Sequence, residues 1–146
     1  MHMTAPRSIR EERMYRRYRR DHKGEECPFC GIAKGHEQYV EETRYFKVIR
    51  NRIPYSIWDG QGVLEHLMIA PKSHTDRLGS LHARAAVEYI GLIDKYESAG
   101  YNVYARAPTS SVKSIVHQHT HLIKLDGKDK RFVLIVHRPL YVRLSR

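Results

Sequence analysis

Three histidines, His117, His119 and His121, stand at alternate positions in the segment HQHTH. Successive side chains of a β-strand point to opposite faces, so on a strand all three imidazoles would share one face, about 6.6 Å apart. The ordinary pKa of imidazole lies near neutrality, and a row of such rings can supply a nucleophile, a phosphate-binding donor and an acid or base. The row is a candidate catalytic site, and a metal-binding tract is the alternative interpretation.

The two cysteines of the chain, Cys27 and Cys30, form a Cys-x-x-Cys pair. Two cysteines are too few for a disulfide scaffold. Their spacing suits a metal site or a redox pair better than a structural bridge. Of these two interpretations we favour the metal site.

The composition indicates one globular domain that attracts anions. The 146 residues are 41% hydrophobic and 29% charged, which argues against a wholly disordered or fibrous chain. The sequence contains no apolar run near the roughly 20 residues of a membrane helix, and its beginning lacks the apolar stretch of a secretory signal. We therefore expect a cytoplasmic protein with no membrane partner. The net charge of +10 favours ligands such as nucleotides, polyphosphates or nucleic acid.

The hydrophobic pattern predicts one long helix over residues 80–100. Apolar residues recur there at steps of three and four between a candidate N-cap, Ser80, and a candidate terminating glycine, Gly100. Stretches rich in β-branched and aromatic residues predict strands at residues 38–50 (two strands joined by a turn), 64–71, 101–107, 114–125 and 131–137. Because short loops join successive strands, we expect an α+β fold with a mostly antiparallel sheet of about five strands.

Three segments together resemble one known family. HQHTHLI resembles the His-x-His-x-His signature of the histidine-triad (HIT) superfamily of nucleotide hydrolases and transferases. CPFCGIAKG resembles the Cys-x-x-Cys segment of its Hint-type branch, and HLMIAPKSH resembles the strand motif His-x-Leu-x-x-Pro-Lys-x-His. The segments follow the family's order, and the resemblance covers about residues 26–125. It implies a HIT-like fold and a purine nucleotide as substrate.

The resemblance also implies roles for four histidines. The middle histidine of the triad, His119, would attack the α-phosphate and form a nucleotidyl-histidine intermediate, which splits one difficult displacement into two easier ones. His121 would donate to a phosphoryl oxygen or assist the leaving group, and His117 would orient the row. His66 would complete the imidazole cluster, although a buried structural histidine is the alternative.

Four further residues are predicted to bind substrate. Asn51 falls where the family holds the ribose hydroxyls, and Ser114 falls where it often has a hydroxyl beside the leaving group. Capping of a turn and a plain surface serine are the respective alternatives. Residues 106–114 lack the family's glycines, so close approach of the backbone to a phosphate is harder. We expect the charges of Arg106 and Lys113 to reach the phosphates instead.

Zinc-bearing Hint-type members imply a ligand set in this chain. Their ligands correspond to Cys27, Cys30, His74 and His117. Two thiolates and two imidazoles suit a closed tetrahedral zinc site with a structural role. A thioredoxin-like redox pair is the alternative for the two cysteines.

Two residues of the triad segment depart from the family pattern, and a third residue, a tryptophan, lies in a loop that is longer than usual. Gln118 and Thr120 are polar where the family is apolar, so the face that they occupy is expected to be less buried or to meet a polar partner. Trp58 lies in the long loop of residues 54–63. It would either contact a base or pack on the protein's own surface.

The chain divides by charge at residue 24. Residues 1–24 are rich in arginine and poor in apolar residues, which predicts a basic arm or solvated helix outside the core. Residues 25–146 are predicted to form the HIT-like nucleotide-binding catalytic domain. The arm would be solvated, contact a second subunit, or hold the phosphate backbone of nucleic acid.

The leading functional hypothesis is hydrolysis of nucleoside phosphoramidates or related nucleoside 5′-phosphate adducts. The alternatives within enzymes are a dinucleoside polyphosphate hydrolase and a deadenylase of nucleic-acid ends. A non-catalytic module that binds nucleotides or nucleic acid is the alternative from another class. Because family members are often twofold dimers, we also expect a homodimer.

Overall fold

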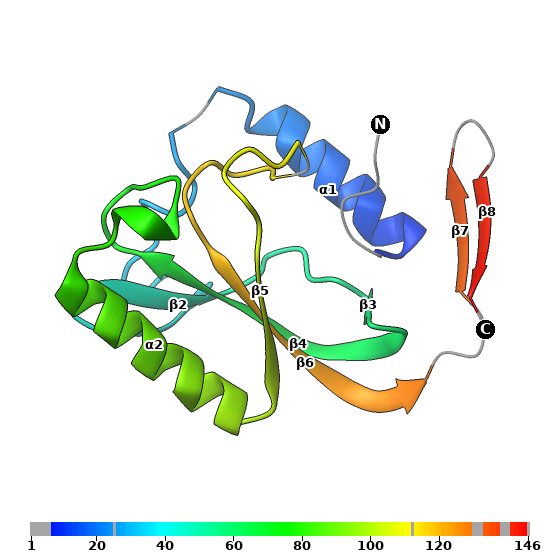
Figure 1. The fold of residues 1–146 in the computed structure, drawn as a ribbon. Coiled ribbons are helices and arrows are strands. Elements are labelled where there is room, and N and C mark those ends of the chain that lie inside the picture. The colour runs from blue at the N-terminus through cyan, green and yellow to red at the C-terminus, as the bar shows by residue number, and fades with distance from the viewer. Residues whose placement is uncertain (1–6, 25, 112, 130–132, 138–140, 146) are drawn as a thin grey trace.

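The computed structural model describes residues 7–24, 26–111, 113–129, 133–137 and 141–145. Its elements are α1 (Ile9–Asp21), β1 (Tyr39–Glu42), β2 (Phe46–Arg50), β3 (Ile57–Trp58), β4 (Gln61–Pro71), a 3₁₀ turn (Leu78–Ser80), α2 (Ala83–Ser98), β5 (Tyr101–Ala105), β6 (Thr120–Asp129), β7 (Val133–His137) and β8 (Tyr141–Ser145) (Figure 1). Neither described helix is long and apolar enough to cross a membrane.

The main sheet has six strands. Its order is β1-β2-β4-β6-β5, with the short β3 paired to β4, and its strand pairs are antiparallel. This confirms the predicted α+β class. The strand predicted at residues 131–137 is β7, but it pairs with β8 in a separate two-stranded sheet. A second helix, α1, accompanies the predicted long one.

The predicted long helix is α2, and it begins slightly later than expected. His82 is its N-cap, since the ring accepts a hydrogen bond from the Ala85 N–H, whereas Ser80 lies in the preceding 3₁₀ turn. Gly100 follows the last turn with a φ of +85°, a conformation that costs glycine little. The signal that ends the helix was therefore located correctly, and the start signal was displaced by two residues.

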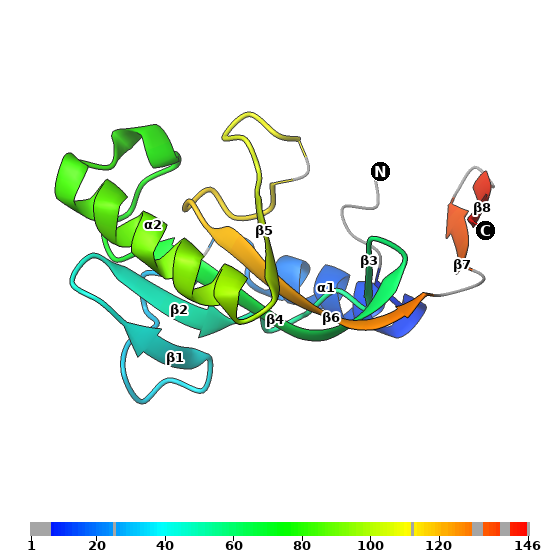
Figure 2. The same cartoon turned by 60° about the horizontal axis from the view of Figure 1, so that its bottom comes forward.

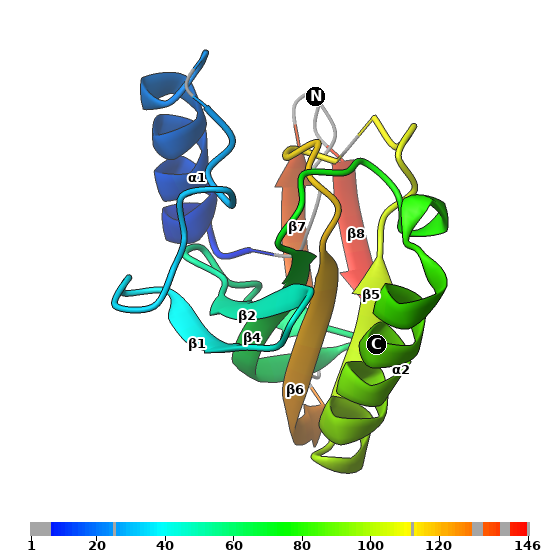
Figure 3. The ribbon, with the colours of Figure 1, turned by 90° about the vertical axis from the view of Figure 1, so that its left-hand side faces the viewer.

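Apolar groups cover both faces of the sheet. The helix α2 lies against one face of the sheet (Figure 2). Its buried residues pack there onto a cluster that includes Phe46, Leu67 and Leu122. On another part of the sheet, Phe29 and Ile32 from the loop before β1 join a cluster with Met68 and Ala70 of β4. Figure 3 shows α1 and α2 on opposite sides of the sheet.

The strand predicted over residues 114–125 begins only at Thr120. Both ladders of β6 end there, with Thr120 opposite Ile69 of β4 and opposite Ala105 of β5. The preceding chain turns away from the sheet, and the Gln118 N–H donates to the Thr75 carbonyl oxygen instead (2.6 Å). The prediction that all three triad histidines lie on one strand was therefore wrong, because only His121 lies within β6.

The N-terminal segment forms a helix that contacts the rest of the chain. Ser8 and Glu11 make a capping box at the start of α1. Glu11 also accepts a hydrogen bond from Ser56, in the loop after β2, and the Ser8 N–H donates to the Ser56 hydroxyl (3.0 Å). The half-buried positions of the helix, which include Tyr15 and Tyr18, recur at steps of three and four. A boundary between an arm and a domain at residue 24 stays a prediction.

Candidate active site

A pocket lies at the point where β6 begins, beneath α1. Five of the predicted site residues line it, namely Asn51, Arg106, Ser114, His119 and His121. Phe29, Ile32 and Met68 supply apolar surface, and Arg7, Tyr15 and Tyr18 reach it from the N-terminal segment. A concave site that combines apolar walls with a few convergent polar groups is the usual form of a small-molecule site.

One ring nitrogen of His119, Nε2, has no hydrogen-bond partner among the residues that the structure describes. Its Nδ1 donates to the His117 carbonyl oxygen at 2.8 Å, so the proton of the neutral ring is on Nδ1 and Nε2 carries a lone pair. Burial lowers the pKa of His119 to about 4, against the opposing effect of this hydrogen bond. The ring is therefore neutral near pH 7 and offers an unprotonated nitrogen.

A chain of hydrogen bonds fixes the tautomers of His66 and His121. The Tyr55 N–H donates to Nδ1 of His66 (3.1 Å), and this makes Nδ1 the acceptor and Nε2 the protonated nitrogen of that ring. His66 Nε2 then donates to His121 Nδ1 (2.9 Å), which leaves the proton of His121 on Nε2. These hydrogen bonds make Nε2 of His121 a hydrogen-bond donor, and His121 lines the pocket.

Burial keeps both members of this pair neutral. It lowers the pKa of His66 to about 3 and lowers that of His121 well below its usual value, and neighbouring positive charges add to both effects. The two rings come from adjacent strands, β4 and β6. The ring centroid of His121 lies 4.9 Å from that of His119, so a free nitrogen and an N–H donor stand side by side at one pocket.

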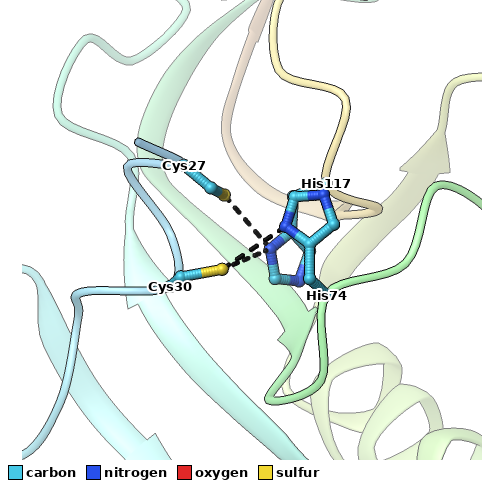
Figure 4. Close-up of side chains that lie close together, drawn as sticks. All are labelled: Cys27, Cys30, His74 and His117. Carbon is cyan, nitrogen blue, oxygen red and sulfur yellow. Dashed lines mark hydrogen bonds between the residues drawn. The ribbon is translucent and has the colours of Figure 1, made fainter. Parts of the chain in front are cut away.

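The predicted metal ligands meet beside the pocket (Figure 4). One candidate ligand atom from each of Cys27, Cys30, His74 and His117 lies within 4.8 Å of the others. His117 Nδ1 lies 3.3 Å and 3.5 Å from the two sulfurs, and His74 Nδ1 lies 3.4 Å from that of Cys30. An ideal tetrahedral zinc site separates sulfur and nitrogen ligands by about 3.6 Å.

The second nitrogen of His117 supports this arrangement. Its Nε2 donates to the Pro71 carbonyl oxygen at 3.0 Å, which leaves Nδ1 deprotonated and turned toward the sulfurs. Metal-binding histidines usually donate their other ring N–H to such an acceptor. The residues present therefore fit a structural zinc ion, with two cysteines from the loop after α1, one histidine after β4 and one before β6.

The comparisons with known proteins identify the fold. No protein-family model matches the sequence, and no curated protein matches it either. Solved structures do match. A zinc-bound histidine triad family protein from Mycobacterium smegmatis gives a TM-score of 0.56 at 21% identity, over 72% of this chain and 78% of that one. A HIT family hydrolase from Clostridium thermocellum gives 0.53 at 20% identity, over 73% and 96%. The chain has the histidine-triad fold.

A third structure extends this likeness. A hypothetical protein from Leishmania major gives a TM-score of 0.55 at 27% identity, and the match covers 71% of this chain and 77% of that one. Within the histidine-triad fold, the predicted HQHTH segment stands at the pocket, with His119 and His121 facing it and His117 turned to the cysteines. The strand motif of residues 66–74 supplies one histidine to each cluster.

Three of the four residues that were predicted to bind substrate, Asn51, Arg106 and Ser114, line the pocket. Asn51 lines the pocket, but its Oδ1 also accepts from the Ile53 N–H (3.0 Å), so it caps a turn as well. The Arg106 guanidinium lies over the Tyr104 ring, 5.3 Å from its centroid, and lines the pocket. Lys113 is placed elsewhere, since its Nζ donates to the Asp76 carbonyl oxygen and to Gln118, each at 2.9 Å.

The polar residues that depart from the family pattern are buried and have polar partners. Thr120 shares a hydrogen bond with the Tyr89 hydroxyl (2.7 Å), and Gln118 accepts from Lys113. Of the two expectations for this face, the polar partner is confirmed and lower burial is wrong. Trp58 stacks on Tyr55, with ring centroids 5.4 Å apart, so it packs on the protein's own surface.

Sequence reasoning missed several pocket residues of this histidine-triad fold. Tyr55 was treated as part of a loop, and its backbone N–H, which orients His66, leaves no sequence signal. Arg7, Tyr15 and Tyr18 were assigned to a solvated arm. The helical spacing of the two tyrosines was a usable signal, because it places both on one face of α1.

Proposed function

We propose that the protein is a nucleotide hydrolase or transferase that acts at the α-phosphate of nucleoside 5′-phosphate adducts, with His119 as the nucleophile. The observation that carries this proposal is the hydrogen bond from His119 Nδ1 to the His117 carbonyl oxygen, which leaves Nε2 unprotonated at the pocket. The histidine-triad fold and the N–H donor on His121 support it.

The reaction is proposed in two displacements. His119 Nε2 forms a bond to the α-phosphorus, the bond from phosphorus to the leaving nitrogen or oxygen breaks, and the leaving group takes a proton from solvent. His121 Nε2–H donates to a non-bridging oxygen, and the His117 carbonyl stabilises the positive charge on His119. Water then attacks phosphorus, the bond to His119 breaks, and the nucleoside monophosphate and a proton are released.

A structural zinc ion and the Hint-type branch are part of the proposal. Cys27, Cys30, His74 and His117 would hold the ion, which would tie the loop before β1 to the segment before β6. That loop carries Phe29, whose ring lies edge-on to His119 with centroids 5.1 Å apart. Zinc would thus set the wall of the pocket without taking part in the chemical steps.

Phosphoramidate-type adducts of purine nucleosides are the first proposed substrates. Dinucleoside polyphosphates are the second candidates, because the pocket lining contains three arginines and no Asp or Glu among the residues that the structure describes. Adenylated nucleic-acid ends are a third, on account of the basic helix α1. We also propose a homodimer, supported by exposed apolar residues on α2, Val87 and Ile90, beside the edge strand β5.

Release of the nucleotide tests this function. Wild-type protein, His119→Ala and the surface control His36→Ala are incubated with adenosine 5′-monophosphoramidate, diadenosine tetraphosphate and a 5′-adenylated oligonucleotide, and AMP is followed by chromatography. Release by wild type and the control, but not by His119→Ala, supports the proposal, and the preferred substrate selects among the three classes. Nucleotide binding without turnover would favour a binding module instead.

A further inference from the structure

Arg7 is buried at the pocket although it belongs to the basic N-terminal segment. Its side chain is 7% exposed. The guanidinium carbon lies 4.2 Å from the ring centroid of Tyr15 and 5.1 Å from that of Tyr55, and Nε donates to the Ile53 carbonyl oxygen at 3.4 Å. Arg7 thus connects α1 to the loop after β2 at the edge of the pocket.

The hydrogen-bonding capacity of this guanidinium is not filled. Among the residues that the structure describes, Nη1 is buried without a hydrogen-bond partner. It forms a long ion pair with Glu12, whose Oε2 lies 4.0 Å away and also lacks a hydrogen-bond partner among those residues. Glu12 also pairs with Arg16 at 3.0 Å and does not line the pocket. A guanidinium carries five N–H donors, and burying them without acceptors costs free energy. Arg7 is therefore prepared to accept an anionic partner from the pocket.

The position of this charge indicates which part of a nucleotide it meets. The guanidinium of Arg7 lies over the Tyr55 ring, and the centroid of that ring is 4.4 Å from the centroid of His66, so Arg7 stands at the imidazole end of the pocket. Its charge also contributes to the lowered pKa of His66. Arg106 also lines the pocket and supplies a second guanidinium, and Arg52 supplies a third, which forms an ion pair with Glu37 (2.6 Å). The group that must sit beside His119 for the proposed reaction is the phosphoryl group, and an arginine matches its geometry.

We propose that Arg7 binds a phosphate oxygen of the nucleotide, which makes the N-terminal segment a part of the substrate site. The inference rests on the proposed function. It extends the site beyond the predicted catalytic domain, since α1 also presents Tyr15 and Tyr18 to the same pocket. Glu12 would hold Arg7 in place and partly offset its charge in the absence of ligand.

Binding measurements with and without a phosphate on the ligand test this role. Dissociation constants for AMP and adenosine are measured by calorimetry in a His119→Ala background, for Arg7→Gln, Arg7→Lys and the exposed control Arg10→Gln. Loss of a charge-assisted hydrogen bond predicts AMP binding weaker by about tenfold to a hundredfold for Arg7→Gln. Adenosine binding is expected to stay within about twofold, Arg7→Lys to recover part of the AMP affinity, and Arg10→Gln to bind AMP normally.

Glu12→Gln gives a second test that keeps Arg7. Removing the carboxylate that partly offsets Arg7 is expected to tighten AMP binding by about twofold to fivefold and to leave adenosine binding unchanged. Equal losses for AMP and adenosine, or no loss in Arg7→Gln, would overturn the inference in favour of a purely structural arginine. If wild type hydrolyses nucleotides while these variants bind normally, the inference alone fails. If wild type binds neither ligand, the proposed function fails with it.

Discussion

Replacement of His66 tests the buried histidine chain through the pH dependence of folding. The pKa of His66 is about 3 in the folded protein, mainly because of burial, against an ordinary value of 6.5. As pH falls below 6.5, His66 becomes protonated in the unfolded chain but stays neutral in the folded protein until pH approaches 3. The unfolded state binds more protons in this window, so the free energy of unfolding decreases as pH falls from 6.5 toward 3.

The size of the effect follows from the shift. Each pKa unit corresponds to about 1.4 kcal/mol, so His66 removes about 5 kcal/mol of stability over the whole window. His66→Gln removes this titration while its amide can still donate toward His121. We expect the free energy of unfolding of the variant to vary with pH less steeply than that of wild type, by about 1.4 kcal/mol per pH unit in the middle of the window.

Urea unfolding at a series of pH values, followed by circular dichroism, measures these slopes. His36→Gln serves as the control, because His36 is exposed and its ring accepts a hydrogen bond from the Gln38 N–H, two residues along the chain. Parallel slopes for wild type and His66→Gln would show that the folded protein tolerates a protonated His66, and the derived tautomer chain would then be wrong.

Three further predictions concern the metal, the core and the assembly. Cys27→Ser is expected to lose bound zinc, measured by elemental analysis, and to unfold at lower temperature, whereas equal zinc content would count against the assigned ligands. Tyr89→Phe leaves the buried Thr120 hydroxyl without its partner and should cost about 1–3 kcal/mol in urea unfolding, and an unchanged value would show that this bond contributes nothing. Light scattering is expected to give twice the mass of one chain for wild type. It is expected to give a lower mass for Ile90→Asp, because the exposed apolar side chain of Ile90 lies on the proposed interface. A monomeric wild type would exclude the dimer.

Local patterns predicted much of the fold. The β-rich stretches gave β1, β2, β4 and β5, and the helical spacing before Gly100 gave α2, because each pattern reflects the burial of one face. The start of β6 could not be predicted in this way. The pattern around His117 and His119 alternates like a strand, but the chain there bonds to Thr75 and turns His117 toward the cysteines.

The candidate site was predicted where motifs carry it and missed where distant segments meet. His119, His121 and His66 share signals that a sequence displays, and the structure brings their rings together. Arg7 donates to the carbonyl oxygen of Ile53, which lies 46 residues later in the sequence, and a local pattern cannot predict such a contact. Lys113 was predicted from its charge near the motif, but its Nζ donates to the Asp76 carbonyl oxygen and to Gln118, and such long-range partners cannot be read from the local sequence.

The proposed mechanism requires that Nε2 of His119 form a covalent bond to the nucleotide. Wild-type protein is mixed with adenosine 5′-monophosphoramidate, quenched rapidly under alkaline conditions that preserve phosphohistidine, and analysed by intact and peptide mass spectrometry. We expect a transient addition of one adenylyl group on the peptide that contains His119, and no such addition in His119→Ala. AMP release without any such adduct at the shortest times, or an adduct that persists in His119→Ala, would contradict it.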